Sequence, residues 1–286
     1  MFLRCILVPV GPATDPTRRL DAALRLGRRL QAHLDVRFIA PGAEHVLASM
    51  ASLVPVDDLT VMAIARSVQE AAAEGEAIVS AWCTREGVRL EAPGERLDAT
   101  FASWSQASGE LEPLLALAGR IHDVIVVDRP NPAVPFTERA FDTALFATGR
   151  PTLMVGDHVP HDLLSHVVVA WNGSLEATRL VGQSMTLLHE AERVTVLLAD
   201  TGKAAEARPA DLCAYLRWHG IVADSVALTV RQNETVGEAI LAEAERRGAS
   251  MLAMGGYTHS RVRQLLLGGA TRHIVEHATM PVLMAH

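Results

Sequence analysis

Cysteine is scarce in this sequence, and no two cysteines have the spacing of a metal-binding or redox pair. Cys5, Cys83 and Cys213 are the only three among 286 residues, and no CxxC occurs. Each stands in an apolar or helical context, which favours buried free thiols in a reducing cytosol over metal or redox roles. We therefore expect a cytoplasmic protein.

Long hydrophobic runs and an excess of positive charge are also absent. Hydrophobic residues make up 49% of the chain, yet no apolar run reaches the ~18–20 residues of a membrane-spanning helix. The short apolar start is broken by Pro9, Gly11, Pro12 and Asp15 and has no small-residue cleavage site, so we expect no secretory signal. The formal net charge of −7 argues against a general nucleic-acid-binding surface. The expected partners include neither a membrane nor a nucleic acid.

The common catalytic motifs are missing as well. There is no GxxxxGK[ST] loop of Walker-type NTPases and no GxSxG nucleophile motif. His273 and His277 share one helix face, but Ile274 stands where an HExxH motif has glutamate, so we interpret them as surface or packing histidines. Ser174 is interpreted as a helix N-cap rather than a nucleophile. We expect no catalytic residue, no metal site and at most slow ATP hydrolysis.

What the sequence does contain is a regular alternation of short apolar runs and helical patterns. Residues 4–10 form a continuous apolar run, as expected for a parallel strand covered on both faces. We interpret the long helical region 58–85 as an amphipathic cover for the sheet, with a lid or partner-docking face as the alternative. The first half is predicted to have strands at 4–10, 34–40, 87–92, 122–128 and 150–156, and helices from about residue 16 and at 58–85, 103–119 and 136–148.

The second half repeats this order of elements with little residue identity. Strands that alternate with helices predict mainly parallel sheets. The sequence therefore predicts an α/β chain with two tandem five-stranded mainly parallel sheets and flanking helices, divided into domains at residues 1–156 and 164–286 with a hinge near 155–165. The strands of the second half are predicted at 166–172, 193–200, 220–228, 249–256 and 280–286.

In open α/β sheets, ligands bind beyond the carboxyl ends of the strands, where the strand order reverses. We expect the first and fourth strands of each half to flank this crevice. In the second half, "GGAT" at 268–271 opens a helix, whose free N–H groups and positive dipole end would face an anion. Arg261, Arg263 and Arg272 would neutralise a polyphosphate. The alternative is that the two glycines only form a tight turn and the arginines are solvated.

The second half resembles the universal stress protein family. Residues 255–269 have the spacing of the family's nucleotide signature, which is Gly, two residues, Gly, nine residues, Gly, then Ser or Thr. The phrases "HSRVRQLLLGGATRHIVEHATMPVLM" and "VVVAWNGSLEA" (167–177) are also similar to the family's C-terminal phrase and to its first strand and turn. The resemblance is fainter over the first half. It implies a tandem universal stress protein with an adenine nucleotide alpha hydrolase-like, Rossmann-like fold and a role in the stress response.

The resemblance also implies which residues would bind ATP, together with Mg²⁺. Three positions depart from the family pattern: Thr258 replaces the second glycine, Gly269 replaces the usual Ser or Thr, and Asn172 stands where ATP-binding members usually carry an aspartate near the ribose. Adenine would lie near Ala170, Asn172 and Ala199, and the phosphates over Gly255, Thr258, Gly268, Gly269 and Thr271, with Met254 and Ala270 beside them.

The first half is expected to have lost its nucleotide site. Pro130, Pro132 and Pro135 remove N–H donors from its loop, and Glu138, aligned with Gly268, would repel phosphate. We expect this half to pack as a built-in partner in an intramolecular pseudo-dimer, and a homodimer of chains also fits the sequence. A second hypothesis stays open: the chain is an interaction or scaffold module of the same fold that binds no nucleotide.

Overall fold

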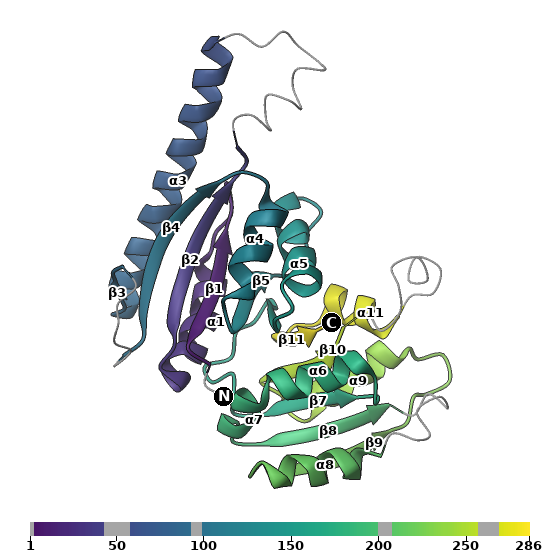
Figure 1. Cartoon of the computed structure of the whole chain (residues 1–286). Helices are drawn as coiled ribbons and strands as arrows, with labels where there is room; N and C mark the ends of the chain where they lie inside the picture. The colour runs from purple at the N-terminus through teal and green to yellow at the C-terminus, as the bar shows by residue number, and fades with distance from the viewer. Residues whose placement is uncertain (1–2, 43–57, 93–98, 200–207, 257–268) are drawn as a thin grey trace. The chain divides into compact units, whose positions relative to one another are not determined.

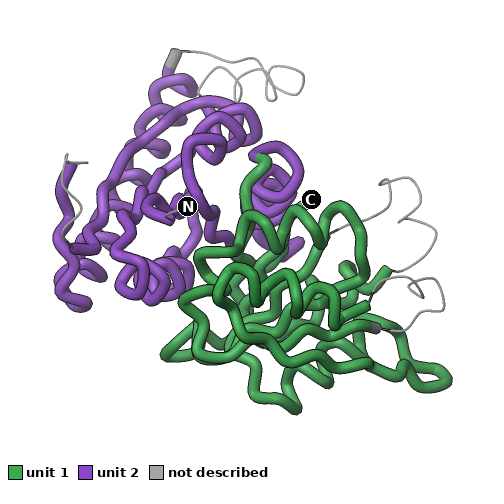
Figure 2. Tube along the Cα trace, turned by 60° about the horizontal axis from the view of Figure 1, so that its bottom comes forward, with its two compact units in different colours: residues 1–2, 128–130, 149–286 green, residues 3–127, 131–148 purple. Residues whose placement is uncertain are grey.

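The computed structural model describes residues 3–42, 58–92, 99–199, 208–256 and 269–286. The chain forms two compact units, each an α/β domain (Figure 2). Unit 2 comprises residues 3–127 and 131–148, and unit 1 comprises residues 1–2, 128–130 and 149–286. None of the described helices is long and apolar enough to cross a membrane.

The sheet of unit 2 is entirely parallel, with the strand order β3-β4-β2-β1-β5. Helix α1 contacts α3, and α4 contacts α5; Figure 1 shows α3 and α4 on opposite sides of the sheet. The elements are β1 (Cys5–Val10), α1 (Thr17–Leu30), β2 (His33–Ala40), α3 (Asp58–Glu86), β3 (Arg89–Leu90), β4 (Phe101–Ser108), α4 (Leu111–Arg120), β5 (Val124–Asp128, of which Asp128 falls in unit 1) and α5 (Pro135–Ala147).

The sheet of unit 1 has the order β6-β11-β10-β7-β8-β9. All its pairs are parallel except β6 with β11, which is antiparallel. Helix α8 packs on β8 and β9, and α9 packs on α11 (Figure 1). The elements are β6 (Thr152–Val155), β7 (Val167–Trp171), α6 (Leu175–Gln183), α7 (Met185–Glu190), β8 (Val194–Ala199), α8 (Pro209–Trp218), β9 (Ala223–Leu228), α9 (Val236–Arg246), β10 (Met251–Gly255), α11 (Ala270–His277) and β11 (Val282–Ala285).

Strands β1, β6 and β11 are almost entirely buried, although β6 ends the sheet of unit 1. Residues Ile6–Val10 of β1 and all of β6 and β11 are buried, as the continuous apolar runs predict for parallel sheets. The predicted α/β fold with mainly parallel sheets and flanking helices is therefore confirmed. Strand β6, which the sequence pattern places in the first half, belongs to unit 1 and lies at the edge of that unit's sheet.

Two predicted elements of the first half have the wrong bounds, and strand β4 was not predicted. Residues 101–108 form strand β4, where the sequence analysis predicts the beginning of a helix at 103, and α4 begins only at Leu111. The predicted strand at 87–92 is reduced to the two residues of β3. The buried side chain of Ser103 explains part of the error, because it bonds to His33 and interrupts the apolar alternation of a half-buried strand.

The long helix α3 covers the sheet only with its later turns. Val79, Trp82 and Cys83 are buried, and the indole nitrogen of Trp82 donates a hydrogen bond to Asp21 of α1 at 2.8 Å. In the first turns, by contrast, Leu59 is 75% and Met62 is 69% exposed. The predicted cover for the sheet is therefore the C-terminal part of the helix.

Candidate functional site

The strand order of unit 1 reverses between β7 and β10. Strand β8 lies on one side of β7, whereas β10, the fourth strand of the repeat, lies on the other side. Ala170 and Met254 are direct partners in the register of these two strands, so the structure brings these two predicted site residues together. Ala199 ends the neighbouring strand β8. This carboxyl edge is where open α/β sheets bind ligands.

The loop after β7 is held by two local hydrogen bonds. The side-chain oxygen of Asn172 accepts the N–H of Ser174 at 3.1 Å, and the hydroxyl oxygen of Ser174 accepts the N–H of Ala177 at 3.2 Å. Between them, Gly173 has a φ of 72°, which favours glycine. Ser174 is the N-cap of α6, so its predicted role is confirmed. Asn172 itself is exposed at the crevice.

Gly255, the last residue of β10, packs directly against the beginning of α6. A β-carbon at this position would lie 2.4 Å from the amide nitrogen of Ala177 and 2.8 Å from the carbonyl carbon of Glu176. Real β-carbons do not approach backbone this closely, so the strand and the helix can meet here only at a glycine. The first glycine of the signature therefore has a packing role, whatever the crevice binds.

The second helix terminus at this edge belongs to α11. Gly269 is its N-cap, with φ −83° and ψ 161°, and no side chain of the described residues caps it. Gly269 is exposed, Ala270 and Thr271 are half-buried, and the first turn carries no acidic residue. The first N–H groups of a helix have no partner within the helix, so this terminus favours an anion.

The remaining predicted residues of the phosphate site and its basic surroundings lie mostly beyond what the structure describes. Thr258 and Gly268, together with Arg261 and Arg263, lie outside the described residues. Arg272 pairs with Glu276 on α11 at 2.8 Å. Its charge is therefore partly neutralised within the helix.

The two histidines of α11 stack on each other. The rings of His273 and His277 have centroids 4.2 Å apart and an interplanar angle of 13°, and the Nδ1 atom of His277 lies 2.9 Å from the carbonyl oxygen of His273. Among the described residues, no group of three His, Cys, Asp or Glu side chains could hold a metal ion. The pair has a packing role in the helix.

The corresponding edge of unit 2 is occupied by an aromatic ring. A β-carbon at Gly11, just after β1, would lie 2.2 to 2.6 Å from ring atoms of Phe136 in α5. Glu138 stands in the first turn of that helix and is exposed. In unit 2, the Phe136 ring and the Glu138 carboxylate thus lie at the beginning of α5. In unit 1, α11 begins at Gly269, without a capping side chain and without an acidic residue in its first turn.

Some residues with clear structural roles carry no signal in the sequence. The positive φ of Gly173 and the contact between Gly255 and Ala177 depend on how β7, α6 and β10 pack, and no motif specifies that packing. The Gly-Ser sequence after β7 indicates only a turn and a helix start.

The comparisons with known proteins agree with this geometry. Residues 164–286 match the model of the universal stress protein family. A universal stress protein from Archaeoglobus fulgidus DSM 4304 superposes with a TM-score of 0.71 at 14% identity, covering 99% of this chain and 97% of its own. A protein of unknown function from Pseudomonas aeruginosa PAO1 superposes with a TM-score of 0.55 at 16% identity, over 98% of this chain and 92% of its own, and a structure from strain UCBPP-PA14 gives the same values.

At these identities the superpositions establish the fold of the whole chain and no more. No protein with a curated description matches the chain. The family assignment rests on the match over residues 164–286, which include β7, α6, β10 and α11. Residues 164–286 therefore form a domain of the universal stress protein family, and the first half of the chain shares the fold.

Proposed function

We propose that this protein is a stress-response factor that binds ATP, with Mg²⁺, at the carboxyl edge of unit 1. The observation that carries the proposal is the exposed N-terminus of α11, where Gly269 caps the helix without help from any described side chain. The N–H groups of this terminus would bind the phosphates, and the adenine would lie beside Ala170, Asn172 and Ala199. The resemblance of residues 255–269 to the family's nucleotide signature supports the same ligand.

Only one of the two halves would bind nucleotide. The Phe136 ring against Gly11 leaves no room for a phosphate at the end of β1, and Glu138 would repel it. The first half would act as a built-in partner in a pseudo-dimer, and pairs of chains would be homodimers. We propose a cytoplasmic location because Cys5, Cys83 and Cys213 are free thiols.

Turnover would be slow or absent. The one hydroxyl at the start of α6, that of Ser174, is used to cap the helix, and it has no histidine or carboxylate partner among the hydrogen bonds of the described residues. Any hydrolysis would therefore depend on Mg²⁺ and water rather than on an activated side chain.

A second function is favoured by two contacts. Asn172 bonds the N–H of Ser174, and Gly255 accommodates the backbone of α6, so both residues have structural roles without any nucleotide. An interaction module with an empty crevice would keep them for these reasons alone. The two functions are therefore distinguished by whether the protein binds a nucleotide.

The direct test is to purify the protein without added ligand, denature it and identify released small molecules by mass spectrometry, followed by calorimetric titration with ATP and Mg²⁺. Gly269→Leu should abolish the binding, because it adds a side chain where the N–H groups face the ligand. Gly182→Leu is the matched control: it is exposed on α6, and no described atom lies within 4 Å of its added β-carbon. Absence of nucleotide by both routes would favour the interaction module, and unchanged ATP affinity in Gly269→Leu would mean that the phosphates do not bind at the N-terminus of α11.

A further inference from the structure

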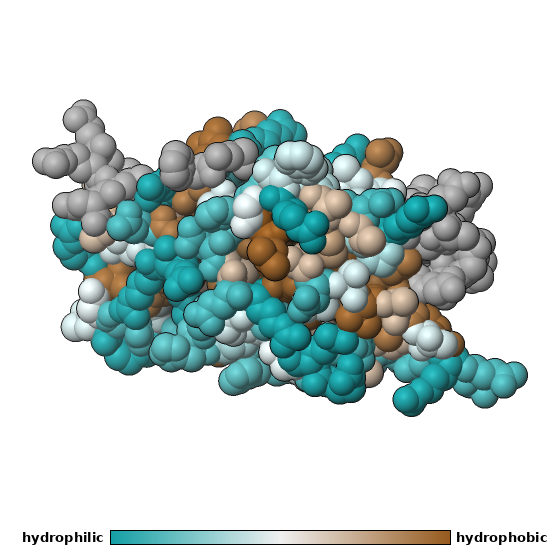
Figure 3. Space-filling view, turned by 90° about the horizontal axis from the view of Figure 1, so that it is seen from below, coloured by the Kyte–Doolittle hydropathy of each residue, from teal (hydrophilic) through white to brown (hydrophobic). Residues whose placement is uncertain are grey.

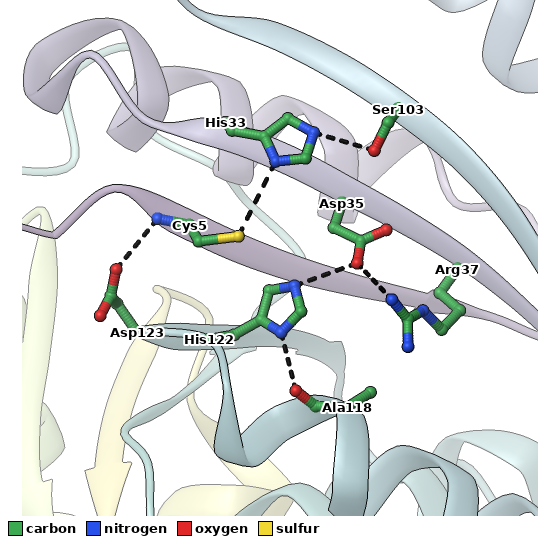
Figure 4. A network of polar contacts seen from close by, with 8 residues as sticks. All are labelled: Cys5, His33, Asp35, Arg37, Ser103, Ala118, His122 and Asp123. Carbon is green, nitrogen blue, oxygen red and sulfur yellow. Dashed lines mark hydrogen bonds and ion pairs between the residues drawn. The ribbon is translucent and has the colours of Figure 1, made fainter. Parts of the chain in front are cut away.

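A polar network lies inside unit 2, on the face of the sheet that α4 covers (Figure 4). At its centre, Asp35 of β2 accepts hydrogen bonds from His122 at 3.1 Å and from Arg37 at 2.7 Å. Cys5 and His33 are the first residues of β1 and β2, so the network begins at the amino edge of the sheet, opposite the carboxyl edge. We call Cys5, His33, Asp35, Arg37, Ser103 and His122, with the neighbouring Ser105 on β4, the Asp35 network.

His122 carries a positive charge in this network. Its ring is buried, with Nδ1 2.7 Å from the carbonyl oxygen of Ala118 and Nε2 3.1 Å from the Asp35 carboxylate. Both oxygens only accept hydrogen bonds, so both ring nitrogens must donate. Burial opposes this charge, but the hydrogen bonds with Asp35, Cys5 and Ala118 outweigh it and raise the pKa of His122 to about 10. One carboxylate therefore faces two cations.

Arg37 and Ser105 have donors that remain unmatched. The Nε atom of Arg37 and the Oγ atom of Ser105 are both buried and have no hydrogen-bond partner among the residues that the structure describes. The two residues are direct partners in the β2–β4 register, so their side chains leave the same face of the sheet. Buried donors in proteins almost always have an acceptor. The Ser105 hydroxyl can also accept a hydrogen bond, but it forms none with Arg37, so both groups are available to a ligand oxygen.

The Arg37 side chain can be approached from solvent. The Arg37 side chain is 28% exposed, whereas that of Asp35 is only 10% exposed. Within the described part of the chain, Asp35 is the one ionic partner of Arg37, and Asp35 is itself neutralised by His122. An anion that reaches Arg37 would meet the guanidinium N–H groups that Asp35 does not use, whereas the Asp123 carboxylate accepts the N–H groups of Arg4 and Cys5 at the amino edge.

We propose that Arg37 and Ser105 form a binding site for a small oxyanion, a phosphate or a carboxylate, on the sheet of unit 2. The planar guanidinium matches the two oxygens of such a group, and the serine hydroxyl adds a third donor. A metal cation is repelled by the same charges. A water molecule would also satisfy the donors, but it carries no charge to pair with the guanidinium. The site belongs to the first half and does not depend on nucleotide binding by the second half.

The test follows the Arg37 Nε–H resonance by ¹⁵N NMR while inorganic phosphate, or separately acetate, is added at constant ionic strength. Each titration is also made with Gly269→Leu, which removes the candidate phosphate site of unit 1. We expect a saturable shift in both proteins. By calorimetry, Arg37→Gln should weaken binding about tenfold or more, and Ser105→Ala about threefold, as expected for a charged and a neutral hydrogen bond. Arg66→Gln is the control, because Arg66 is an 80% exposed arginine paired with Glu70 on α3.

Several outcomes would overturn the proposal. If neither anion gives a saturable shift, water fills the site. If binding disappears in Gly269→Leu, the anion binds in unit 1. If Arg66→Gln weakens binding as much as Arg37→Gln, the attraction is unspecific. If circular dichroism shows that Arg37→Gln does not fold, the proposal is tested by the wild-type titration and by the affinity of Ser105→Ala. It is then wrong if the wild type gives no saturable shift or if Ser105→Ala binds as tightly as the wild type. The comparison of phosphate with acetate identifies which oxyanion binds.

Discussion

The Cα atom of Gly255 lies so close to α6 that a β-carbon on it would come within 2.4 Å of the amide nitrogen of Ala177. This contact fixes the end of β10 against the beginning of α6, at the carboxyl edge of the sheet. Gly255→Ala must therefore push strand and helix apart. We expect a loss of about 1–3 kcal/mol in the free energy of unfolding, as for other overpacked sites, measured by urea denaturation.

The matched control for this prediction is Gly182→Ala on α6. No described atom lies within 4 Å of the added β-carbon, and alanine is the better helix former, so stability should rise by up to about 1 kcal/mol. Equal stability of Gly255→Ala and the wild type would mean that the contact between β10 and α6 is looser in solution.

The sequence was sufficient to predict the fold because its strongest signals are local. The apolar run at 4–10 and its counterpart at 166–172 each have strand length and alternate with helical patterns, and both became central strands. Strand β4 was not predicted from the sequence, because Ser103 and Ser105 lie in the Asp35 network and do not pack in an apolar core. A buried strand whose inward face is polar has no periodic apolar pattern to detect.

Contacts between distant residues could not be predicted at all. Asp35 and His122 are 87 positions apart and become neighbours only because β1 lies between β2 and β5. The same holds for β6, whose apolar sequence predicts a buried strand but does not specify that it pairs antiparallel with β11. At the candidate site, the family signature indicated the glycines, whereas the packing role of Gly255 depends on the position of α6.

The charge on His122 should make the stability of unit 2 depend on pH. The folded state raises the pKa of His122 to about 10, well above the ordinary value of about 6.5. Its contribution to the free energy of unfolding is therefore complete below about pH 6.5 and is lost as pH rises toward about 10. We expect a decrease of about 2–4 kcal/mol between pH 7 and pH 10 in urea denaturation.

In His122→Gln this decrease should be much smaller, because glutamine donates one of the two hydrogen bonds but does not titrate. His219→Gln, which changes an exposed histidine of unit 1, should keep the wild-type dependence. A His122→Gln protein with the full wild-type slope would show that the imidazolium of His122 is not its source.

The two ends of α3 should respond differently to truncation. Val79 is completely buried, so Val79→Ala removes packed apolar atoms and should cost about 1–3 kcal/mol of unfolding free energy. Met62 is 69% exposed, and Met62→Ala should change stability by no more than about 0.5 kcal/mol. Thermal and urea denaturation of the two variants provide the measurement. A cost above about 1 kcal/mol for Met62→Ala would mean that another surface covers the first turns of α3 in solution.

The exposed apolar side chains of unit 1 stand singly or in one small group at the end of α8. Leu175, Trp218 and Val222 are 69%, 89% and 81% exposed. On the face drawn in Figure 3, hydrophobic side chains form small groups between hydrophilic ones. Isolated exposed apolar residues are normal for a folded domain and indicate no particular partner.

Asn172 provides the sharpest test of the proposed nucleotide. It replaces the aspartate that ATP-binding members of the family carry near the ribose, and its side-chain oxygen accepts the N–H of Ser174. Asn172→Asp keeps that acceptor and adds a charged acceptor for a ribose hydroxyl. If ATP binds at this edge, its affinity should rise about three- to tenfold in calorimetry, as one stronger hydrogen bond allows, with little change in stability.

The control is Asn131→Asp in the first half, where the asparagine oxygen accepts the N–H of Ala133 in the same way at 3.0 Å. This variant adds the same charge to an equivalent turn and should leave ATP affinity unchanged. Equal effects of the two substitutions would mean that the added negative charge acts at long range. ATP binding that weakens in Asn172→Asp alone would place the polyphosphate, rather than the ribose, beside residue 172, since like charges repel there. The adenine and phosphate ends of the crevice would then be exchanged relative to the proposal.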